Sequence, residues 1–377
     1  MTLPRVVATR GVPVLAWSTA LRADTAKQLT RLAEQPWVVH HVAAMPDAHV
    51  SEGVAVGSVF ATRDVVVPGA LGTDLGCGVS AVRFELAPRF ERRALEALLT
   101  EWTQRIPVGD EEHRRPLADI PRTLFDAPLS TNELERTRVR LVPRHLGTLG
   151  GGNHFVELDR AHDGTTWLLV HTGSRGLGGA IGHHHGRIAG KLGALSIDAP
   201  DGRAFWADLS WALDFAKANR DAIMTQALAA TRDVLGLEPD EDSRLDLHHN
   251  FAQREEHFGE PCIVHRKGAI HAPEGRLALI PGSMGTASYV VRGRGHAAAF
   301  ASASHGAGRV MTRREARARI SRHHLERQLR GVVFDDSRPH LVEEAPTAYR
   351  DVMEVLEDEV ELVEPVLRLE PLVVLKG

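Results

Sequence analysis

The stretch Ser304-His305-Gly306-Ala307-Gly308-Arg309, SHGAGR, lies between an alanine-rich run and a run of helical character that begins near Thr312. Two near-adjacent glycines follow its histidine at the expected entrance of a helix, where free backbone N–H groups can face an anion. Arg309 adds a planar guanidinium that suits phosphate or carboxylate. The same hexapeptide is also typical of an ordinary glycine-rich turn with an incidental histidine. Its meaning therefore depends on what the rest of the chain places around it.

Composition places the chain among soluble globular proteins. It has 377 residues, of which 43% are hydrophobic and 25% are charged, and this length allows one large domain or two ordinary ones. No run of about 18 apolar residues is present. The first residues, MTLPRVVATRGVPVLAW, lack the apolar core and cleavage site of a signal peptide. We therefore expect a cytoplasmic protein with no membrane segment.

Charge and cysteine content narrow the possibilities further. The formal net charge is −4, so a polyanion would have to be bound by a local basic patch. The two cysteines, Cys77 and Cys262, cannot form a disulfide framework. The chain has 21 histidines but only 2 tyrosines, and several histidines stand beside glycine or asparagine at expected strand ends. Such positions commonly carry functional sites.

Hydrophobic periodicity and turn residues predict helices and strands mixed along the whole chain. Asp24 is expected to cap a helix over residues 25–34, and Pro46 is expected to hold Asp47 and His49 in a loop. Other helices are predicted at 89–105, 132–141, 312–329 and 348–359, with two more within 205–235. Strands are predicted at 37–42, 53–61, 64–67, 79–84, 166–170, 244–247, 262–267, 277–280 and 372–375.

The glycine-rich segment GTDLGCG, residues 72–78, indicates a metal site. Its three glycines allow tight turns, so Asp74 and Cys77 can point at one centre. A carboxylate with a thiolate suits a borderline metal such as Mn²⁺ or Zn²⁺. The alternative is a small buried cysteine behind an aspartate that caps a helix.

Histidines recur where strands are expected to begin or end. His154 follows four glycines and precedes a strand, and His171 leaves the strand at 166–170 ahead of a Gly/Ser/Arg loop. His154 and Glu157 are candidate metal or nucleotide ligands, and Asn153 is a candidate hydrogen-bonding partner. The triple histidine at 183–185 is expected to be solvated or structural, because successive helical residues point in different directions.

Two further stretches complete the set of candidate binding elements. Residues 281–289 form another glycine-bearing loop that is rich in backbone donors. At the other end of the set, the apolar run 372–375 predicts a buried strand that ties Lys376 into the core. The motif-bearing loops extend from residue 47 to residue 376, and no repeat or low-complexity linker separates them. We therefore expect one domain, residues 1–377, built around one site.

Together these stretches resemble the RtcB family of GTP-dependent RNA-splicing ligases. The resemblance rests on nine segments in the family's order: MPDAH, GTDLGCG, GTLGGGNHFVE, HTGSRG, HHNFAQRE, HRKGA, IPGSMGTASYVV, SHGAGRVMTR and LKG. It covers essentially the whole chain. It implies an α+β fold, with a β-rich core wrapped by helices and an active site where loops converge.

The resemblance also implies roles for individual residues. Asp74, Cys77 and His154 correspond to ligands of one Mn²⁺, and Cys77, His171 and His249 to ligands of a second. His305 corresponds to a nucleophile that forms a histidine–GMP intermediate with GTP. The residues that match guanylate-binding positions are Asn153, His154, Phe155, Val156, Glu157, His249, Asn250, Pro281, Gly282, Ser283, Met284, Ser288, His305, Gly306, Ala307, Gly308 and Lys376.

The implied reaction joins an RNA 3′-phosphate or 2′,3′-cyclic phosphate end to a 5′-hydroxyl end, in RNA repair or tRNA splicing. Arg175, Arg309, Arg313 and Arg314 are the expected phosphate contacts. RNA is the expected partner, and the protein is expected to be a monomer. Whether an accessory protein takes part is left open. Three alternatives remain: a binuclear metal-dependent phosphodiesterase or cyclic phosphate hydrolase, an enzyme that caps 3′-phosphate ends with GMP, and a non-catalytic RNA-binding module. A non-catalytic module would not need the five candidate metal ligands together. The retained SHGAGR and LKG segments count against the hydrolase.

Overall fold

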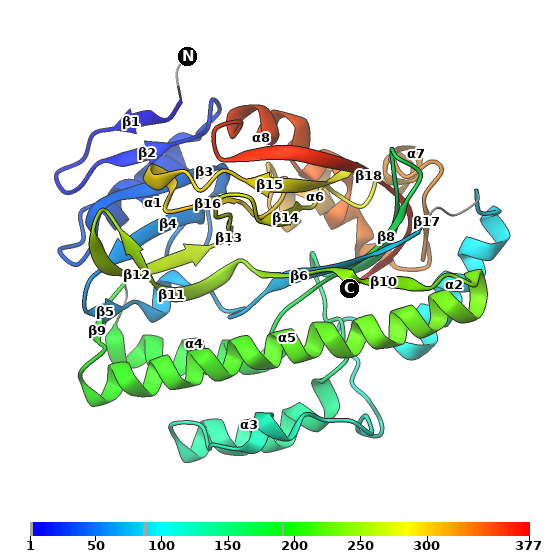
Figure 1. Ribbon diagram of the computed structural model, residues 1–377, viewed down its shortest axis with the longest axis horizontal. Coiled ribbons are helices and arrows are strands. Elements are labelled where there is room, and N and C mark those ends of the chain that lie inside the picture. Colours follow the sequence, from blue (N-terminus) through cyan, green and yellow to red (C-terminus); the bar gives the residue numbers. More distant parts are fainter. Residues whose placement is uncertain (1–2, 86–88, 191) are drawn as a thin grey trace.

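Two β-sheets that share a hydrophobic core form the centre of the computed structural model, which describes residues 3–85, 89–190 and 192–377. Helices cover the core on several sides (Figure 1). The shared core combines Met45 and Val264 of one sheet with Leu169 and Val290 of the other. Because both sheets contribute to one core, loops from both can reach a common site.

The first sheet has six strands in the order β1-β2-β3-β4-β12-β11. Its neighbouring strands are antiparallel except for the parallel pair β2 and β3. Helix α1 (Ala23–Ala33) packs against β3. The strand bounds are β1 (Arg5–Val7), β2 (Val14–Ala16), β3 (Val39–His49), β4 (Val56–Thr62), β11 (Asn250–His257) and β12 (Glu260–Lys267).

The second sheet has eight strands, in the order β10-β6-β8-β7-β18-β15-β14 with β17 beside β18. Its strand bounds are β6 (Gly78–Phe84), β7 (Phe155–Ala161), β8 (Thr166–Thr172), β10 (Pro239–His248), β14 (Leu277–Ile280), β15 (Ser288–Gly293), β17 (Val333–Phe334) and β18 (Val363–Lys376). Two smaller ladders pair β5 (Val65–Val66) with β9 (Leu195–Ser196), and β13 (Ala269–His271) with β16 (Ser302–Ser304).

The pleat of the second sheet decides which side chains reach the site. On β7, Phe155 belongs to the shared core, whereas Val156 and Leu158 pack into a separate cluster with helices α2 (Arg92–Arg105) and α5 (Pro200–Leu235). Because side chains alternate along a strand, Glu157 lies on the Phe155 side. The sheet therefore turns one face to the helices and the other to the first sheet.

Three predicted helices differ in the structure. The stretch 205–235 forms part of a single helix, α5, of 36 residues, which has no proline or glycine between Arg203 and its left-handed cap at Gly236. The stretch 312–329 forms two helices, α6 (Arg313–Arg319) and α7 (Arg322–Gln328), because the Ser321 side chain accepts a hydrogen bond from His324 N and starts a new helix. Asp24 lies in the first turn of α1, and Arg22 occupies the capping position.

Two other helices follow the predictions with shifted ends, α3 (Asn132–His145) and α8 (Val352–Asp358). Helix α4 (Arg175–Ala189) is not among the predicted helices, and it begins within the Gly/Ser/Arg stretch that was expected to be a loop. Short 3₁₀ turns lie at Pro68–Ala70, Arg122–Phe125, Ala297–Ala299, Pro339–Glu344 and Pro346–Ala348. The helix predicted at 89–105 is present as α2, which begins at Arg92. Residues 86–88, just before the predicted start, lie outside the described residues.

The prediction that Asp47 and His49 lie in a loop is wrong, because β3 continues to His49. The pairing of β3 with β4 shifts register between Ala44 and His49. Pro46 has no backbone N–H to donate to a neighbouring strand. It is tolerated here because the strand pairing is irregular in this segment.

The α+β expectation is confirmed, since predominantly antiparallel sheets are combined with helices that cover them. Among the described residues, no helix is both long enough and apolar enough to cross a lipid bilayer.

Candidate active site

Three neighbouring strands of the second sheet bring their ends to one point. In the ladder of β6, β8 and β7, His171 pairs with Val79 on one side and with Phe155 on the other. Cys77 and His154 each stand just before one of these flanking strands. The strand register therefore places a thiol and two imidazoles side by side.

These side chains form a buried group with the geometry of metal ligands. The Cys77 Sγ lies 3.5 Å from His154 Nε2 and 3.4 Å from His171 Nε2, and all three atoms lie within 4.8 Å of one another. The His154 Nδ1 lies 2.8 Å from the Leu149 carbonyl oxygen, and the His171 Nδ1 lies 3.2 Å from that of Asn153. Since a carbonyl only accepts, each Nδ1 is the protonated nitrogen and each Nε2 presents its lone pair.

Asp74 borders this group from the loop before β6. Its Oδ2 lies 3.0 Å from His154 Nε2, and its Oδ1 accepts a hydrogen bond of 3.1 Å from Ser174 N. Burial acts to raise the pKa of Asp74, but His154, Cys77 and Arg175 together lower it below its ordinary value. Gly173 is required here, because a Cβ at that position would lie 2.2 Å from Asp74 Oδ1.

The donor set fits a divalent metal ion. Burial, followed by the Asp74 carboxylate, raises the pKa of the Cys77 thiol well above its ordinary value. Burial also lowers the pKa of His171 well below its usual range, so this imidazole is neutral. A cation would bind the two imidazole Nε2 atoms and displace the thiol proton, since a coordinating thiol is deprotonated outright. Sulfur with imidazole nitrogen suits a transition metal rather than Ca²⁺ or Mg²⁺.

His249 connects the metal-binding group to His305. Its backbone N donates to the Cys77 carbonyl oxygen at 2.8 Å. Its ring centroid lies 5.2 Å from that of His171 and 4.8 Å from that of His305. Within the described parts of the chain, its buried Nδ1 has no hydrogen-bond partner. A buried nitrogen without a partner at this place is suited to bind a ligand.

His305 follows β16, whose pairing of Ser304 with Ala269 fixes where it emerges. Its Nδ1 lies 2.6 Å from Oδ2 of Asp47, whose side chain is fully buried. Gly308 adopts a φ of +71°, and a Cβ there would lie 2.6 Å from the Asp47 carbonyl oxygen. The second glycine of SHGAGR, Gly308, therefore allows this loop to approach the backbone of β3 at Asp47 closely.

The pairing of Asp47 with His305 was missed by the sequence reasoning. The only available signal was the acidic residue within MPDAH, because contacts between segments far apart in the sequence leave no local pattern. Glu359 was also missed: its Oε2 accepts a hydrogen bond of 3.0 Å from Ser304 N, and burial raises its pKa to about 8.

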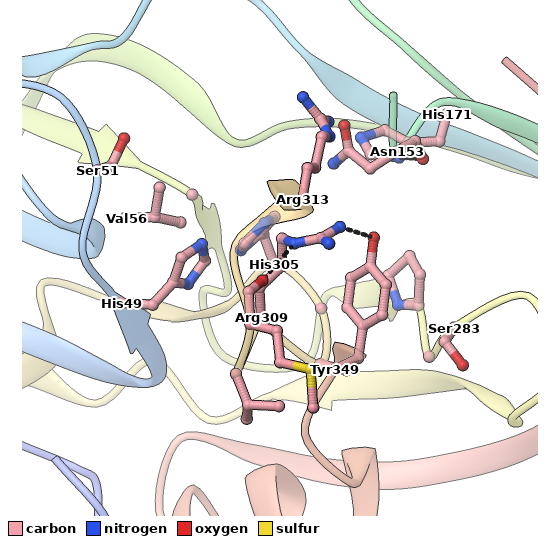
Figure 2. A pocket seen from close by; sticks show the side chains of 18 of the residues that line it. His49, Ser51, Val56, Asn153, His171, Ser283, His305, Arg309, Arg313 and Tyr349 are labelled. Atoms are coloured by element: carbon pink, nitrogen blue, oxygen red, sulfur yellow. Dashed lines mark hydrogen bonds between the residues drawn. The ribbon is translucent and has the colours of Figure 1, made fainter. Parts of the chain in front are cut away.

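One cavity of about 560 Å³ gathers most of the predicted site residues. Asp74, Cys77, His171 and His249 all line it. Figure 2 shows His305 between His49 on one side and His171 on the other. The predicted guanylate residues that line it are Asn153, Phe155, Glu157, His249, Asn250, Pro281, Gly282, Ser283, Met284, Ser288, Gly306, Ala307, Gly308 and Lys376. His154 lies behind this lining in the metal-binding group. The Val156 side chain instead packs on the opposite face of the sheet.

Lys376 is fixed in the cavity wall. It pairs with Phe155 at the end of β18, and its Nζ donates to the Asn153 carbonyl oxygen at 3.0 Å. Its Nζ also lies 3.6 Å from Glu344 Oε2. Burial lowers the pKa of Lys376, although the Glu344 and Glu157 carboxylates act to raise it. The predicted strand that ties this lysine to the core is therefore present.

Glu157 lies near this lysine in a strongly buried position. Burial raises its pKa to about 7, and the charge of Lys376 acts to lower it. Burial and the neighbouring Glu157 raise the pKa of Asp159 well above its ordinary value. One buried carboxyl of this pair therefore stays protonated at neutral pH.

The four predicted phosphate contacts occupy different environments. Arg309 lines the cavity, but its guanidinium donates to Tyr349 Oη at 2.9 Å and to the carbonyl oxygens of Glu343 and Met311 at 2.6 and 3.0 Å (Figure 2). Arg313 also lines the cavity and is half-exposed.

The other two arginines do not line the cavity. Arg175 donates to Thr148 Oγ1 and to the Gly109 carbonyl oxygen, both at 3.0 Å, and Arg314 is exposed. Within the triple histidine, His185 is buried and lies 2.7 Å from Asp208, whereas His183 is exposed. This contact gives His185 a structural role.

The fold and the site define a protein with a buried thiol–imidazole group, suited to hold a metal ion, beside a cavity that is lined by His305. The model of the family described as tRNA-splicing ligase RtcB matches residues 28–130 and 125–377. The chain belongs to the RtcB family.

Similar proteins occur in bacteria, in an archaeon and in Entamoeba. The chain is 32% identical over 407 residues to the RNA-splicing ligase RtcB of Escherichia coli K12, covering 99% of both chains. It is 32% identical over 437 residues to the RNA-splicing ligase RtcB of Mycobacterium tuberculosis, covering 93% of this chain and all of that protein. The tRNA-splicing ligase RtcB of Nanoarchaeum equitans is 29% identical, over 93% of this chain and 91% of its own length.

Proposed function

We propose that the protein is an RNA ligase that joins RNA 3′-phosphate or 2′,3′-cyclic phosphate ends to 5′-hydroxyl ends, with GTP and Mn²⁺. One observation carries the proposal: a single cavity holds His305, the metal-binding group and the loops that match guanylate-binding segments. Family membership gives the same class of enzyme. We further propose that residues 1–377 act as one domain, because residues from Arg22 to Lys376 line this cavity.

The metal-binding residues are proposed to hold two ions. Asp74, Cys77 and His154 would hold one, and Cys77, His171 and His249 the other, with the Cys77 sulfur shared. When bound, Mn²⁺ would neutralise phosphate charge and orient GTP. The unpartnered Nδ1 of His249 and the two fixed imidazoles support this division.

His305 is proposed to be the nucleophile. Because its Nδ1 lies 2.6 Å from the Asp47 carboxylate, the ring keeps its proton there and presents Nε2 to the cavity. Nε2 attacks the α-phosphorus of GTP, the N–P bond forms, and pyrophosphate leaves with the electrons of the broken P–O bond. The resulting phosphoramidate is reactive enough to pass GMP onward.

The guanylate would lie against the opposite side of the cavity. The Lys376 ammonium and the Glu157 carboxyl line the cavity beside apolar side chains that include Phe155 and Met284. Apolar walls with few polar groups are typical of sites that select one base. Backbone N–H groups of the loops at 281–284 and 306–308 are proposed to contact the phosphate and ribose.

The RNA steps then follow from phosphate chemistry. A cyclic phosphate is first hydrolysed to the 3′-phosphate. An oxygen of the 3′-phosphate attacks the phosphorus of the GMP on His305. A new P–O bond forms as the N–P bond breaks, His305 Nε2 takes the electron pair, and the RNA end is capped with GMP. The 5′-hydroxyl of a second RNA attacks the 3′-phosphorus, and GMP leaves. We propose that the enzyme acts as a cytoplasmic monomer in tRNA splicing or RNA repair.

Labelling with GTP tests the proposal directly. The protein is incubated with α-labelled GTP and Mn²⁺, with and without an RNA strand that carries a 3′-phosphate. We expect covalent label that is lost in acid and kept in alkali, as a phosphoramidate requires. His305→Ala should not label, whereas His183→Asn, at an exposed histidine, should label like the wild type. Retained label in His305→Ala would show that His305 is not the nucleophile. If the protein were instead a metal-dependent phosphodiesterase, the wild type itself would not be labelled.

A further inference from the structure

The cavity has a second wall that none of the proposed roles uses. Figure 2 shows His49, Ser51 and Val56 on one side of His305, with Asn153, His171 and Ser283 on the other. All of them line the same cavity. His49 is the titratable group of this second wall that lies closest in sequence to Asp47, the partner of His305.

The structure fixes the orientation of the His49 imidazole. The residue ends β3 and pairs with Val56 of β4 just after the register shift. Its Nδ1 lies 2.8 Å from the Asp47 carbonyl oxygen. Because a carbonyl oxygen only accepts, Nδ1 carries the proton and Nε2 carries the lone pair.

The Nε2 of His49 is available as a base. No residue that the structure describes forms a hydrogen bond with it, and the side chain borders the cavity. Burial lowers the pKa of His49, and the nearby His305 and Arg309 charges lower it further. The ring is therefore neutral at neutral pH, which is the form that accepts a proton.

The geometry of phosphoryl transfer gives this base a place in the reaction. In such transfers the attacking and leaving oxygens lie roughly in line on opposite sides of the phosphorus. Under the proposed function, the leaving GMP lies on the guanylate side of the cavity. The attacking 5′-hydroxyl must then enter from the opposite side, which is the wall that carries His49.

Resting on the proposed function, we propose that His49 is the general base of the sealing step. Its Nε2 accepts the proton of the RNA 5′-hydroxyl as that oxygen bonds to the 3′-phosphorus of the capped strand. The bond between the 3′-phosphorus and the oxygen that bridges it to GMP breaks, and GMP leaves with the electron pair. The products are a 3′,5′-phosphodiester, GMP and a protonated His49, which returns its proton to water.

Step-resolved kinetics of His49→Asn test the assignment. The asparagine amide can still donate to the Asp47 carbonyl oxygen, but it lacks a base in the place of Nε2. With labelled GTP, Mn²⁺ and two synthetic RNA strands, one with a 3′-phosphate and one with a 5′-hydroxyl, the labelled protein, the capped RNA and the sealed RNA are measured over time. We expect sealing to slow by about 10²–10⁴-fold, with accumulation of capped RNA. His183→Asn serves as the matched control, with no slowing.

The pH profile separates a base from a structural residue. Wild-type sealing should keep its rate below the ordinary histidine pKa of about 6.5 and fall only at lower pH, because the pKa of His49 is lowered. Sealing by His49→Asn should instead keep rising with pH as the hydroxyl ionises unaided. His49→Gln is the second variant if circular dichroism shows that the asparagine variant is misfolded.

Two results would overturn the inference. One is wild-type sealing of capped RNA by the His49 variants. The other is equal slowing of labelling, capping and sealing in folded variants, which would make His49 structural. Absence of label on His305 in the wild type would instead overturn the proposed function itself, so the two failures can be told apart.

Discussion

The metal-binding group and the His305 loop lie in one cavity, but they are built in different ways. Cys77, His154 and His171 stand at the ends of adjacent strands, and the register of one sheet sets their spacing. His305 follows the short strand β16, and it depends on Asp47 from the other sheet and on Arg309 contacts to a third segment. Strand register thus places the candidate metal ligands, whereas tertiary contacts place His305.

This difference indicates how each region should respond to change. A sheet corner tolerates loss of one ligand without moving its backbone, because ladder hydrogen bonds hold the strands. The His305 loop has less backbone pairing, so its position should follow the charges and side chains around it. Substitutions in the first region should therefore change metal content, and those in the second should change nucleotide use or stability.

The largest effect is expected for Cys77→Ser. The hydroxyl keeps the shape but stays protonated at neutral pH, so the shared soft ligand is lost. We expect loss of both metal ions and of labelling with GTP, measured by elemental analysis and by α-labelled GTP. Cys262→Ser is the matched control, since Cys262 is a buried free cysteine in β12. Wild-type Mn²⁺ content in Cys77→Ser would contradict the shared-ligand assignment.

An intermediate effect is expected for Lys376→Met, which keeps the length of the side chain and removes its charge. A hydrogen bond from a charged donor contributes about 1.5–3 kcal/mol, or about one to two decades in affinity. Labelling at sub-saturating GTP should slow by that factor, while metal content stays as in the wild type. Lys217→Met, on the exposed side of α5, controls for loss of a lysine. Unchanged labelling would show that Lys376 does not contribute to GTP binding and has a structural role only.

The smallest effect concerns the pH dependence of stability near the His305 loop. Although burial acts to raise the pKa of Glu344, Lys376 and Arg309 lower it to about 2. This folded-state pKa lies below the ordinary value of 4.5. The stabilisation is therefore complete above the ordinary value and is lost as the pH falls toward 2.

Between pH 5 and pH 3.5 we expect Glu344 to account for a loss of about 1 kcal/mol in the free energy of unfolding. Urea unfolding at both pH values measures it, and Glu344→Gln should remove this part of the pH dependence. Glu343→Gln, at the half-buried neighbour that binds Arg317, is the control and should retain it. An identical pH dependence in Glu344→Gln and the wild type would exclude this role for the carboxylate.

Local patterns predicted those parts of the structure that local forces determine. The short runs 167–170 and 372–375, which precede His171 and Lys376, are apolar throughout, and glycines mark the turns beside His154, His171 and Cys77. The candidate metal ligands could therefore be found from the sequence. The resemblance to a family then ordered these segments around one site. The α+β class followed from the mixture of helical and strand-like stretches.

The errors arose where tertiary contacts override local preference. Pro46 predicts a loop, but the irregular pairing of β3 with β4 tolerates it within a strand. The contact of Asp47 with His305 joins two segments far apart in the sequence, and no periodicity reports it. The same holds for Arg309, whose donors turn toward Tyr349 and neighbouring carbonyl oxygens rather than standing free for phosphate.

The position of β18 has a consequence for the order in which the molecule folds. This strand lies between β7 and β15, so among the described residues the two parts of the eight-stranded sheet share no ladder until residues 363–376 pair with both. Its pairing of Val374 with Glu157 closes a very long loop, and such non-local pairing is intrinsically slow. The Cys77 corner, made by β6, β7 and β8, can assemble earlier. During refolding, affinity for metal should therefore return before the ability to use GTP.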